Sequence, residues 1–425
     1  MKEYYTLSEV ADLLGKSKET LRNWDRSGKL TAVREPMSNY RVYRKEQLKI
    51  FDELDFLFNP AEKGNKVEPE RKYSVLELFA GAGGLAIGLE KAGLNCVGLN
   101  EIDHWAAETL RVNRPKWRVI EEDVRNVSFS EYKDKVDVVT GGFPCQAFSY
   151  AGKKLGLNDA RGTLFYEFAR VVKETQPLIC VGENVRGLLN HDGGRTIEGM
   201  ISILDEIGYR PLDPKILKAI FYKVPQKRER LILIGIRKDI AVDFTFPKPY
   251  KRIYNLADAL KKGDLFDTDV PDSPGTSYPG RKKEILDLVP PGGYWRDLPL
   301  DLQMEYMQKS FYLGGGKTGM ARRMSWDEPS LTLTCSPAQK QTERCHPDET
   351  RPFKVREYAR IQTFPDDWKF AGPITQQYKQ IGNAVPVNLA KELGFSIVNF
   401  LNEVYQEYNL EERVQDYNQM ALPIE

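Results

Sequence analysis

Three short polar segments of the sequence contain residue types that could carry out covalent chemistry. Cys145 follows a proline in the segment GGFPCQAFS, and Glu183 lies in the segment GENV. A cysteine held behind a proline at the end of a buried strand is placed to act as a nucleophile, because parallel sheets expose functional groups at the carboxyl ends of their strands. A glutamic acid partly desolvated at another strand end can stay protonated near neutral pH and act as a general acid.

The third segment, QKRER, precedes an apolar run and contains Arg228 and Arg230. Two guanidinium groups could hold a phosphate, a carbonyl group or the carboxyl group of Glu183, although a charged turn before a strand is also common. For Cys145 the usual alternative is a buried structural thiol, which the polar, glycine-rich neighbours disfavour. The three segments together indicate nucleophilic catalysis by a cysteine that has an acidic partner.

A glycine-rich turn, ELFAGAGG from Glu77 to Gly84, joins an apolar run to a helical pattern. Glycines in such a turn let a ligand approach the backbone at the helix N-terminus. Glu101 follows about twenty residues later, where a carboxylate would reach ribose hydroxyls. Asp123 could accept a hydrogen bond from an adenine amine, although a lone aspartate there is more often a helix cap. Dehydrogenases or a merely tight turn would look similar, so this pattern alone is weak.

The elements that must position these residues follow an alternating pattern. Apolar runs occur at Val75–Phe79, Cys96–Leu99, Val136–Val139, Leu178–Val181 and Leu231–Ile236, with helical patterns around Leu85, Thr109, Phe168 and Ile203. This alternation predicts an α/β fold with an open, parallel, doubly wound Rossmann-like sheet and helices on both faces. Residues 246–345 lose the rhythm and are rich in Pro, Gly, Tyr and basic side chains, which indicates an inserted, loop-rich domain.

The first fifty residues predict a separate helix-turn-helix unit with a small β wing around Tyr40 and Val42. One helix buries Val10, Ala11, Leu13 and Leu14 and ends at Gly15, and Ser17 caps a second helix that turns Leu21 and Trp24 inward. Lys18, Arg22 and Arg26 share the outer face of this second helix, where they could meet phosphates. The segment resembles the winged helix-turn-helix of the MerR type. A module for packing or for protein contacts is the alternative.

Composition narrows the class of protein. Lys and Arg total 62 against 61 Asp and Glu, so the net charge of +1 gives no global field for nucleic acid, and any such partner must meet a local patch. The five cysteines form no CxxC pair and the three histidines are far apart, which argues against a disulfide framework and against a metal site. We find no apolar leader and no run of about 18 apolar residues, and therefore expect a cytoplasmic protein without a membrane partner.

Eight segments in fixed order resemble the motif set of bacterial DNA (cytosine-5) methyltransferases of the type II restriction-modification kind. They are ELFAGAGGLAIGL, NEID, GGFPCQAFS, DARGTLFYEFAR, GENVRGLL, PQKRERLILIGIR, RPFKVREYARIQTFPDDW and QYKQIGNAVPVNLA, from residue 73 to about residue 400. The resemblance implies that Cys145 adds to carbon 6 of a flipped cytosine and that Glu183 is the acid at its ring nitrogen 3. It implies that Asn184, Arg228 and Arg230 organise this pocket and hold the base.

The resemblance also implies S-adenosyl-L-methionine as the cofactor and double-stranded DNA as the partner. The implied cofactor positions are Phe79, Gly81, Gly84, Glu101, Ile102, Asp123, Pro144, Leu164, Asn383 and Val385. The implied organisation is a MerR-like domain (1–55), a linker (56–72), a catalytic domain in two parts (73–245 and 346–405), a target recognition domain (246–345) and a C-terminal tail (406–425). We expect a monomeric enzyme that protects host DNA from a cognate endonuclease, with an N-terminal domain that binds its own promoter.

Candidate DNA-contacting residues come from three regions. Gln146, Ser149 and Lys153 belong to an implied loop that closes over DNA, Arg296, Arg322 and Arg323 lie in the insert beside Trp295 and Trp326, and Lys18 and Arg22 lie in the N-terminal domain. Both tryptophans could equally form the insert's own core. The segment Thr332–Thr334 resembles a short element found near the ends of such domains.

The sequence departs from the family pattern at four positions. Glu77 replaces an aspartate, Ile102 an aromatic residue, Lys223 a glycine and Val387 a second proline. None of these changes removes a reacting group, so we expect an active enzyme. Two alternatives are a DNA-binding regulator whose inactive methyltransferase fold senses the cofactor, and a transfer RNA methyltransferase of the same lineage.

Overall fold

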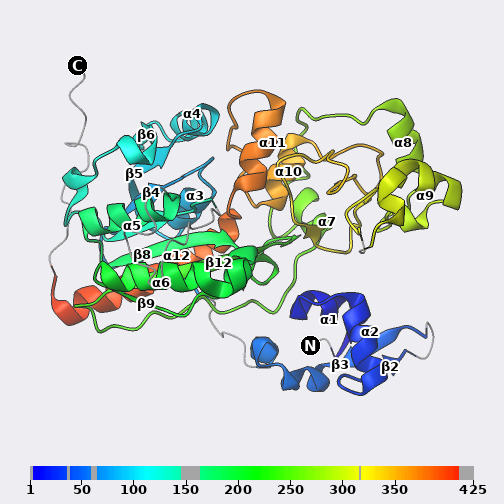
Figure 1. The fold of residues 1–425 in the computed structure, drawn as a ribbon, viewed down its shortest axis with the longest axis horizontal. Coiled ribbons are helices and arrows are strands. Elements are labelled where there is room, and N and C mark those ends of the chain that lie inside the picture. Colours follow the sequence, from blue (N-terminus) through cyan, green and yellow to red (C-terminus); the bar gives the residue numbers. More distant parts are fainter. Residues whose placement is uncertain (1–2, 36–38, 59–64, 145–162, 315–316, 411–425) are drawn as a thin grey trace. The chain divides into compact units, whose positions relative to one another are not determined.

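The computed structural model describes residues 3–35, 39–58, 65–144, 163–314 and 317–410. The chain forms two compact units, one made of Met1–Asn65 with Lys248–Arg252 and the other of Lys66–Pro247 with Ile253–Glu425 (Figure 1). Among the described helices, none has the length and apolar character needed to cross a bilayer.

The first unit has the predicted helix-turn-helix and wing. Its elements are β1 (Tyr4–Thr6), α1 (Leu7–Leu14), α2 (Lys18–Ser27), β2 (Val33–Arg34), β3 (Arg41–Arg44) and the 3₁₀ helices η1 (Lys45–Ile50) and η2 (Asp52–Leu57). Gly15 ends α1 in the left-handed conformation, and the Ser17 hydroxyl caps α2 by accepting from the Thr20 amide. The strands form an antiparallel sheet in the order β1-β3-β2. Trp24 is only half-buried and stacks on Phe51.

The second unit is built on a large sheet in the order β10-β12-β8-β7-β4-β5-β6. The parallel strands are β4 (Ser74–Leu78), β5 (Asn95–Glu101), β6 (Val119–Glu121), β7 (Val138–Gly141) and β8 (Ile179–Val185). The antiparallel strands are β9 (Tyr209–Pro211), β10 (Lys215–Lys218) and β12 (Glu229–Arg237).

The prediction of an all-parallel sheet is therefore wrong at one edge. The connection from β10 to β12 spans only residues 219–228, and the Ala219 amide donates to the Arg228 carbonyl oxygen across its base (2.8 Å). Such a short connection permits antiparallel pairing, whereas parallel strands need a crossover of a dozen or more residues. As a result, β12 begins beside the carboxyl end of β8, with Arg230 opposite Val185.

Helices cover both faces of this sheet. The α-helices of this unit outside the insert are α3 (Gly84–Lys91), α4 (His104–Asn113), α5 (Leu164–Thr175), α6 (Arg195–Glu206), α10 (Val355–Ile361), α11 (Ile374–Asn383) and α12 (Val387–Tyr408) within the described residues. The 3₁₀ helices there are η3 (Val124–Asn126), η4 (Ser130–Tyr132), η5 (Arg186–Gly194) and η6 (Ala219–Phe221). Leu76 and Leu78 of β4 pack in the same cluster as Phe168 of α5. Leu99 of β5 packs in a second cluster with Ile87 of α3.

The insert is irregular, as predicted, with short helices α7 (Leu256–Leu260), α8 (Gly280–Asp287), η7 (Trp295–Asp297), α9 (Leu300–Met307) and η8 (Gln308–Tyr312), and strand β13 (Ser330–Leu331) paired with β11 (Gln226–Lys227). Figure 1 shows α8 and α9 at the end of this unit remote from β9, with α7, α10 and α11 between. Leu286, Trp295 and Met307 share a core of the insert, whereas Leu256 of α7 packs in the cluster that contains Tyr358 of α10.

A buried carboxylate joins the sheet to the last helix. Asp137, just before β7, accepts hydrogen bonds from the Ser74 amide (2.8 Å) and hydroxyl (2.9 Å) at the start of β4. Its other oxygen accepts from the hydroxyl group of Tyr405 in α12 (2.6 Å). This aspartate therefore fixes the end of the sheet opposite to the carboxyl ends of the parallel strands.

We predict that Tyr405→Phe destabilises the second unit by about 1–3 kcal/mol, because the substitution removes a buried hydrogen bond to a charged acceptor. Urea unfolding of the full chain measures the change. Tyr312→Phe is the matched control, since Tyr312 is 75% exposed and should leave the unfolding midpoint unchanged. Equal midpoints for the two variants would contradict the prediction.

Candidate active site

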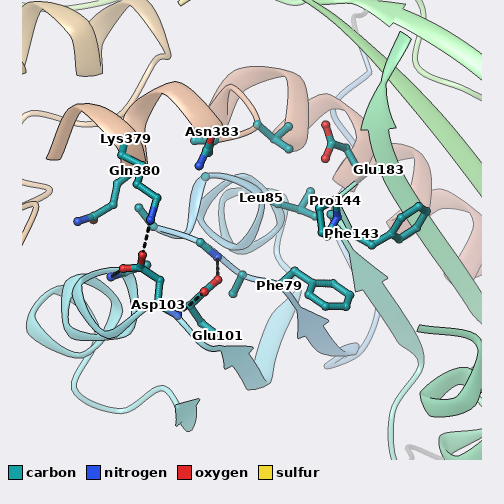
Figure 2. A pocket seen from close by; sticks show the side chains of 18 of the residues that line it. Phe79, Leu85, Glu101, Asp103, Phe143, Pro144, Glu183, Lys379, Gln380 and Asn383 are labelled. Atoms are coloured by element: carbon teal, nitrogen blue, oxygen red, sulfur yellow. Dashed lines mark hydrogen bonds and ion pairs between the residues drawn. The ribbon is translucent and has the colours of Figure 1, made fainter. Parts of the chain in front are cut away.

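A cavity of about 780 Å³ opens at the carboxyl ends of β4, β5, β7 and β8 (Figure 2). All ten predicted cofactor residues line it, namely Phe79, Gly81, Gly84, Glu101, Ile102, Asp123, Pro144, Leu164, Asn383 and Val385. Glu183, Asn184, Arg228 and Arg230 line the same cavity. The structure thus brings together fourteen residues that are widely separated in the sequence.

The glycine-rich turn forms the floor of the cavity. Phe79, Gly81 and Gly83 have positive φ angles (56°, 54° and 85°), which bend the chain sharply from β4 into α3. Within the described residues, no side chain caps the first turn of α3. The amide groups of that turn and the positive end of the helix dipole are therefore available to a polar ligand.

Close packing explains why residue 84 is glycine. A β-carbon at Gly84 would lie 2.4 Å from the Val385 carbonyl oxygen. The loop between α11, which ends at Asn383, and α12 contains Val385 and therefore rests directly on the start of α3. This contact closes the cavity on the side opposite the sheet.

Glu101 is held rigidly at the end of β5. One carboxylate oxygen accepts from the Gly81 amide (2.7 Å) and the other from the Asp103 amide (2.7 Å). Burial, opposed by these two backbone hydrogen bonds, raises the pKa of Glu101. Figure 2 shows both bonds together with the ion pair that joins Asp103 to Lys379 of α11 (2.7 Å). The carboxylate keeps free lone pairs for a ligand hydroxyl.

Ile102 and Asp123 form the outer wall. Ile102 is 65% exposed on the cavity wall, where a flat apolar ligand would cover its side chain. Asp123 caps η3 and pairs with Arg125, whose hydrogen bond lowers the pKa of the Asp123 carboxyl group. The helix cap considered from the sequence is therefore present, and it lies on the cavity wall.

Glu183 and Arg230 form a buried ion pair at the other end of the cavity. Arg230 reaches Glu183 because β12 runs antiparallel to β8. The second oxygen of Glu183 faces Gly142, where an added β-carbon would lie 3.0 Å from it. A glycine at position 142 therefore leaves this carboxyl group accessible from the cavity.

Asn184 positions the segment before Cys145. Its side-chain amide donates to the Phe143 carbonyl oxygen (2.8 Å), and its own oxygen accepts from the Val185 amide (2.8 Å). The predicted residues Cys145, Gln146, Ser149 and Lys153 lie outside the described residues.

Arg228 is buried and connects three segments. Its guanidinium donates to the carbonyl oxygens of Leu333 (3.0 Å) and Gly382 (2.8 Å). Burial, with a smaller effect of nearby Arg230, lowers the pKa of Arg228. The neighbouring Gln226, which the sequence reasoning did not single out, accepts from the Leu333 amide (3.0 Å) and donates to Gln362 (2.9 Å). Gln226 could have been identified from the sequence because it lies two residues before Arg228 in the same motif.

The insert residues differ in exposure. Arg323 is 4% exposed and donates to the carbonyl oxygens of Leu286 and Val289, so it supports the insert from inside and is not carried forward as a DNA contact. Arg322 is largely buried, 3.6 Å from Glu328. Arg296 is exposed above the ring of Trp295, which belongs to the core.

The remaining candidates lie on surfaces. Trp326 is half-buried, and its indole N–H donates to Asp348. In the first unit, Lys18 is exposed at the start of α2, whereas Arg22 is bonded to Glu19 (3.0 Å).

Comparison with known proteins places these features in context. Residues 73–399 match the model of C-5 cytosine-specific DNA methylases, and residues 6–43 match that of MerR family regulatory proteins. The chain is 64% identical to type II methyltransferase M.Eco47II of Escherichia coli, over 95% of this chain and 97% of that protein. It is 57% identical to type II methyltransferase M.PspPI of Psychrobacter sp. (strain TA137), over 94% and 97%.

One solved structure shares the fold. It is a prophage-encoded E. coli protein described as a DNA modification methyltransferase, with a TM-score of 0.56 and 24% identity, and the match covers 78% of this chain and 100% of that one.

We predict that Gly84→Ala destabilises the protein by about 1–3 kcal/mol, because the new methyl group displaces the loop that contains Val385. Thermal unfolding measures the effect. Gly280→Ala is the control: this glycine is also the first residue of a helix, and its added β-carbon would meet nothing within 4 Å. A loss of stability no larger than in the control would disprove the close contact.

Proposed function

The chain belongs to the C-5 cytosine-specific DNA methylases, and we propose that its cavity binds S-adenosyl-L-methionine beside a cytosine flipped out of duplex DNA. It is a type II DNA methyltransferase of the restriction-modification kind, and it methylates carbon 5 of cytosine. This membership disfavours both an inactive cofactor sensor and a transfer RNA enzyme. The observation that carries the proposal is that one cavity gathers the glycine-rich turn, Glu101 and Glu183.

The residues of the cavity fit this donor. The volume of the cavity is in the range of pockets that bind drug-sized ligands. Glu101 would bind the ribose hydroxyls, exposed Ile102 would cover the adenine, and Asp123 would accept from the adenine amine. The uncapped turn of α3 and the loop containing Asn383 would hold the polar methionine part. When bound, the donor supplies an electrophilic methyl group.

We infer the following roles for the residues of the chain. The Cys145 thiolate forms a bond from sulfur to carbon 6 of cytosine, which makes carbon 5 nucleophilic, while Glu183 places a proton at ring nitrogen 3. After methylation, carbon 5 loses its proton to solvent water acting as the base, ring nitrogen 3 returns its proton to Glu183, and the bond from carbon 6 to sulfur breaks, which restores the aromatic ring and the Cys145 thiolate. Arg230 orients Glu183 by the ion pair, and Asn184 fixes the backbone that leads to Cys145.

DNA must contribute an extruded base, because carbon 5 cannot be reached inside a stacked duplex. We propose that the insert contacts the target duplex through Arg296 on its surface and through the largely buried Arg322 near that surface. The segment that contains Gln146, Ser149 and Lys153 contacts the duplex as well. We further propose that the enzyme works as a monomer in the bacterial cytoplasm and protects host DNA from a cognate endonuclease.

We predict that Cys145→Ser abolishes detectable methyl transfer and that Glu183→Gln lowers its rate by about 10²–10⁴-fold, since each change removes a group that acts on the ring. Purified protein, labelled S-adenosylmethionine and DNA of mixed sequence provide the assay, and bisulfite sequencing locates the product. Cys96→Ser is the control, because burial raises the pKa of the Cys96 thiol and makes it a poor nucleophile. Full activity in Cys145→Ser would refute the mechanism.

For the first unit, we propose salt-sensitive binding to DNA upstream of the gene, independent of methylation. We predict that Lys18→Ala weakens binding of the full chain to this DNA several-fold at low salt, because Lys18 is exposed at the start of α2. Lys66→Ala removes an exposed charge outside this unit and serves as the control in the same band-shift assay. Equal affinity of the two variants would exclude α2 as the contact surface.

A further inference from the structure

One acidic side chain of the cavity has no assigned role. Glu77, at the second-to-last position of β4, lines the cavity and is only 2% exposed. Within the part of the chain that the structure describes, its buried Oε2 has no hydrogen-bond partner. Buried polar groups in proteins are nearly always paired, so an unpaired carboxyl oxygen beside a cavity points to a partner that comes from a ligand.

The strand register places Glu77 between two assigned acids. Glu77 lies beside Leu99 of β5 and Thr140 of β7, and Thr140 lies beside Val181 of β8. Side chains alternate between the two faces along a strand, so the residues two positions beyond Leu99 and Val181 share this face. These residues are Glu101 and Glu183. Figure 2 shows Glu101 and Glu183 on different sides of the cavity.

The proposed function assigns Glu101 to the ribose and Glu183 to the cytosine. The sulfonium group joins the ribose of the donor to the methionine part of the donor. The methyl group on the sulfonium must point to the target cytosine. On this assignment the sulfonium would lie between the two ends of the row, near Glu77. The free side chain of Glu77 has the right place and chemistry to face a cation.

The charge state of Glu77 in the free protein follows from its surroundings. Burial, and then the nearby carboxylates of Glu101 and Glu183, raise the pKa of Glu77 well above its usual value. The Cys96 thiol, on the neighbouring strand, has a pKa raised by burial and then by Glu77. The side chains that act on Glu77 are thus acidic, and together with burial they favour the protonated form of its carboxyl group.

We propose that Glu77 faces the sulfonium of the bound methyl donor and releases its proton when the donor binds, so that the site distinguishes the cationic donor from the neutral thioether product. The inference rests on the proposed binding of S-adenosylmethionine. An ionised Glu77 attracts the sulfonium in a site of low dielectric constant, whereas S-adenosylhomocysteine offers no such charge. Because donor binding releases a proton, the preference for donor over product increases as the pH rises.

Isothermal titration calorimetry tests the proposal, with S-adenosylmethionine and S-adenosylhomocysteine as probes. Titrations near pH 7 in buffers of different ionisation enthalpy give the number of protons released on binding. The α-amino group of each probe is mostly protonated near pH 7, so it contributes little to the proton count. We expect the donor to release up to about one proton more than the product from wild-type protein.

Glu77→Gln mimics the protonated side chain, so we expect it to remain folded, to lose the extra proton release and to lose about tenfold or more of the preference for donor. Glu121→Gln, at an exposed acid outside the cavity, should behave as wild type. Equal proton release by wild type and Glu77→Gln would overturn the inference.

Two further outcomes remain informative. If Glu77→Gln fails to fold, the ratio of donor affinity to product affinity, measured for the wild-type protein at several pH values, still tests the proposal. A ratio that does not change with pH contradicts proton release on donor binding. If the wild-type protein binds neither probe, the proposed cofactor site is wrong, which is a different failure from binding without proton release.

Discussion

The buried guanidinium of Arg228 is the interaction on which the assembly of the site depends. It joins the start of β12 to Leu333, 105 residues later, and to Gly382, 154 residues later. Burying a cation costs free energy unless its donors are satisfied, so these carbonyl groups have to converge on Arg228. The end of the insert and the loop that covers the cavity are thereby fixed at the same point of the sheet.

This arrangement requires the antiparallel direction of β12. In a parallel strand, the residues that precede the apolar run would lie at the amino ends of the other strands, away from Glu183. Because β12 runs against β8, Arg228, just before β12, and Arg230, its second residue, instead lie beside the cavity. One reversed strand thus supplies both the anchor of the loops and the partner of the catalytic acid.

The sequence predicted local structure well, since caps and apolar periodicity are encoded within a few residues. Gly15 and Ser17 delimit the first two helices as expected, and the parallel strands β4, β5, β7 and β8 overlap the predicted apolar runs, whereas β6 was not among them. The cofactor positions depended on motif resemblance, and the strand ends bring them to one cavity. Strand direction is set by tertiary pairing, so the reversal of β12 had no local signal.

The insert was predicted least accurately, for a related reason. Arg323 and Trp295 look like DNA-reading residues in a basic, aromatic segment, yet both are buried. In a domain with short helices, many carbonyl groups lack helical partners, and an arginine can satisfy several of them at once. A basic residue in such a domain therefore serves either the surface or the interior, and composition does not distinguish the two.

The electrostatics of the site also explain how DNA can approach three clustered acids. Glu183 is paired with Arg230, and Glu101 is held by two backbone amides. Burial raises the pKa of Glu77 and so favours its neutral form, and Arg228 lines the cavity as a second cation. The cavity therefore presents little net negative charge to a phosphate backbone, although its chemistry requires acidic groups. The overall charge of +1 is an average over the whole chain and does not indicate a lack of affinity for nucleic acid.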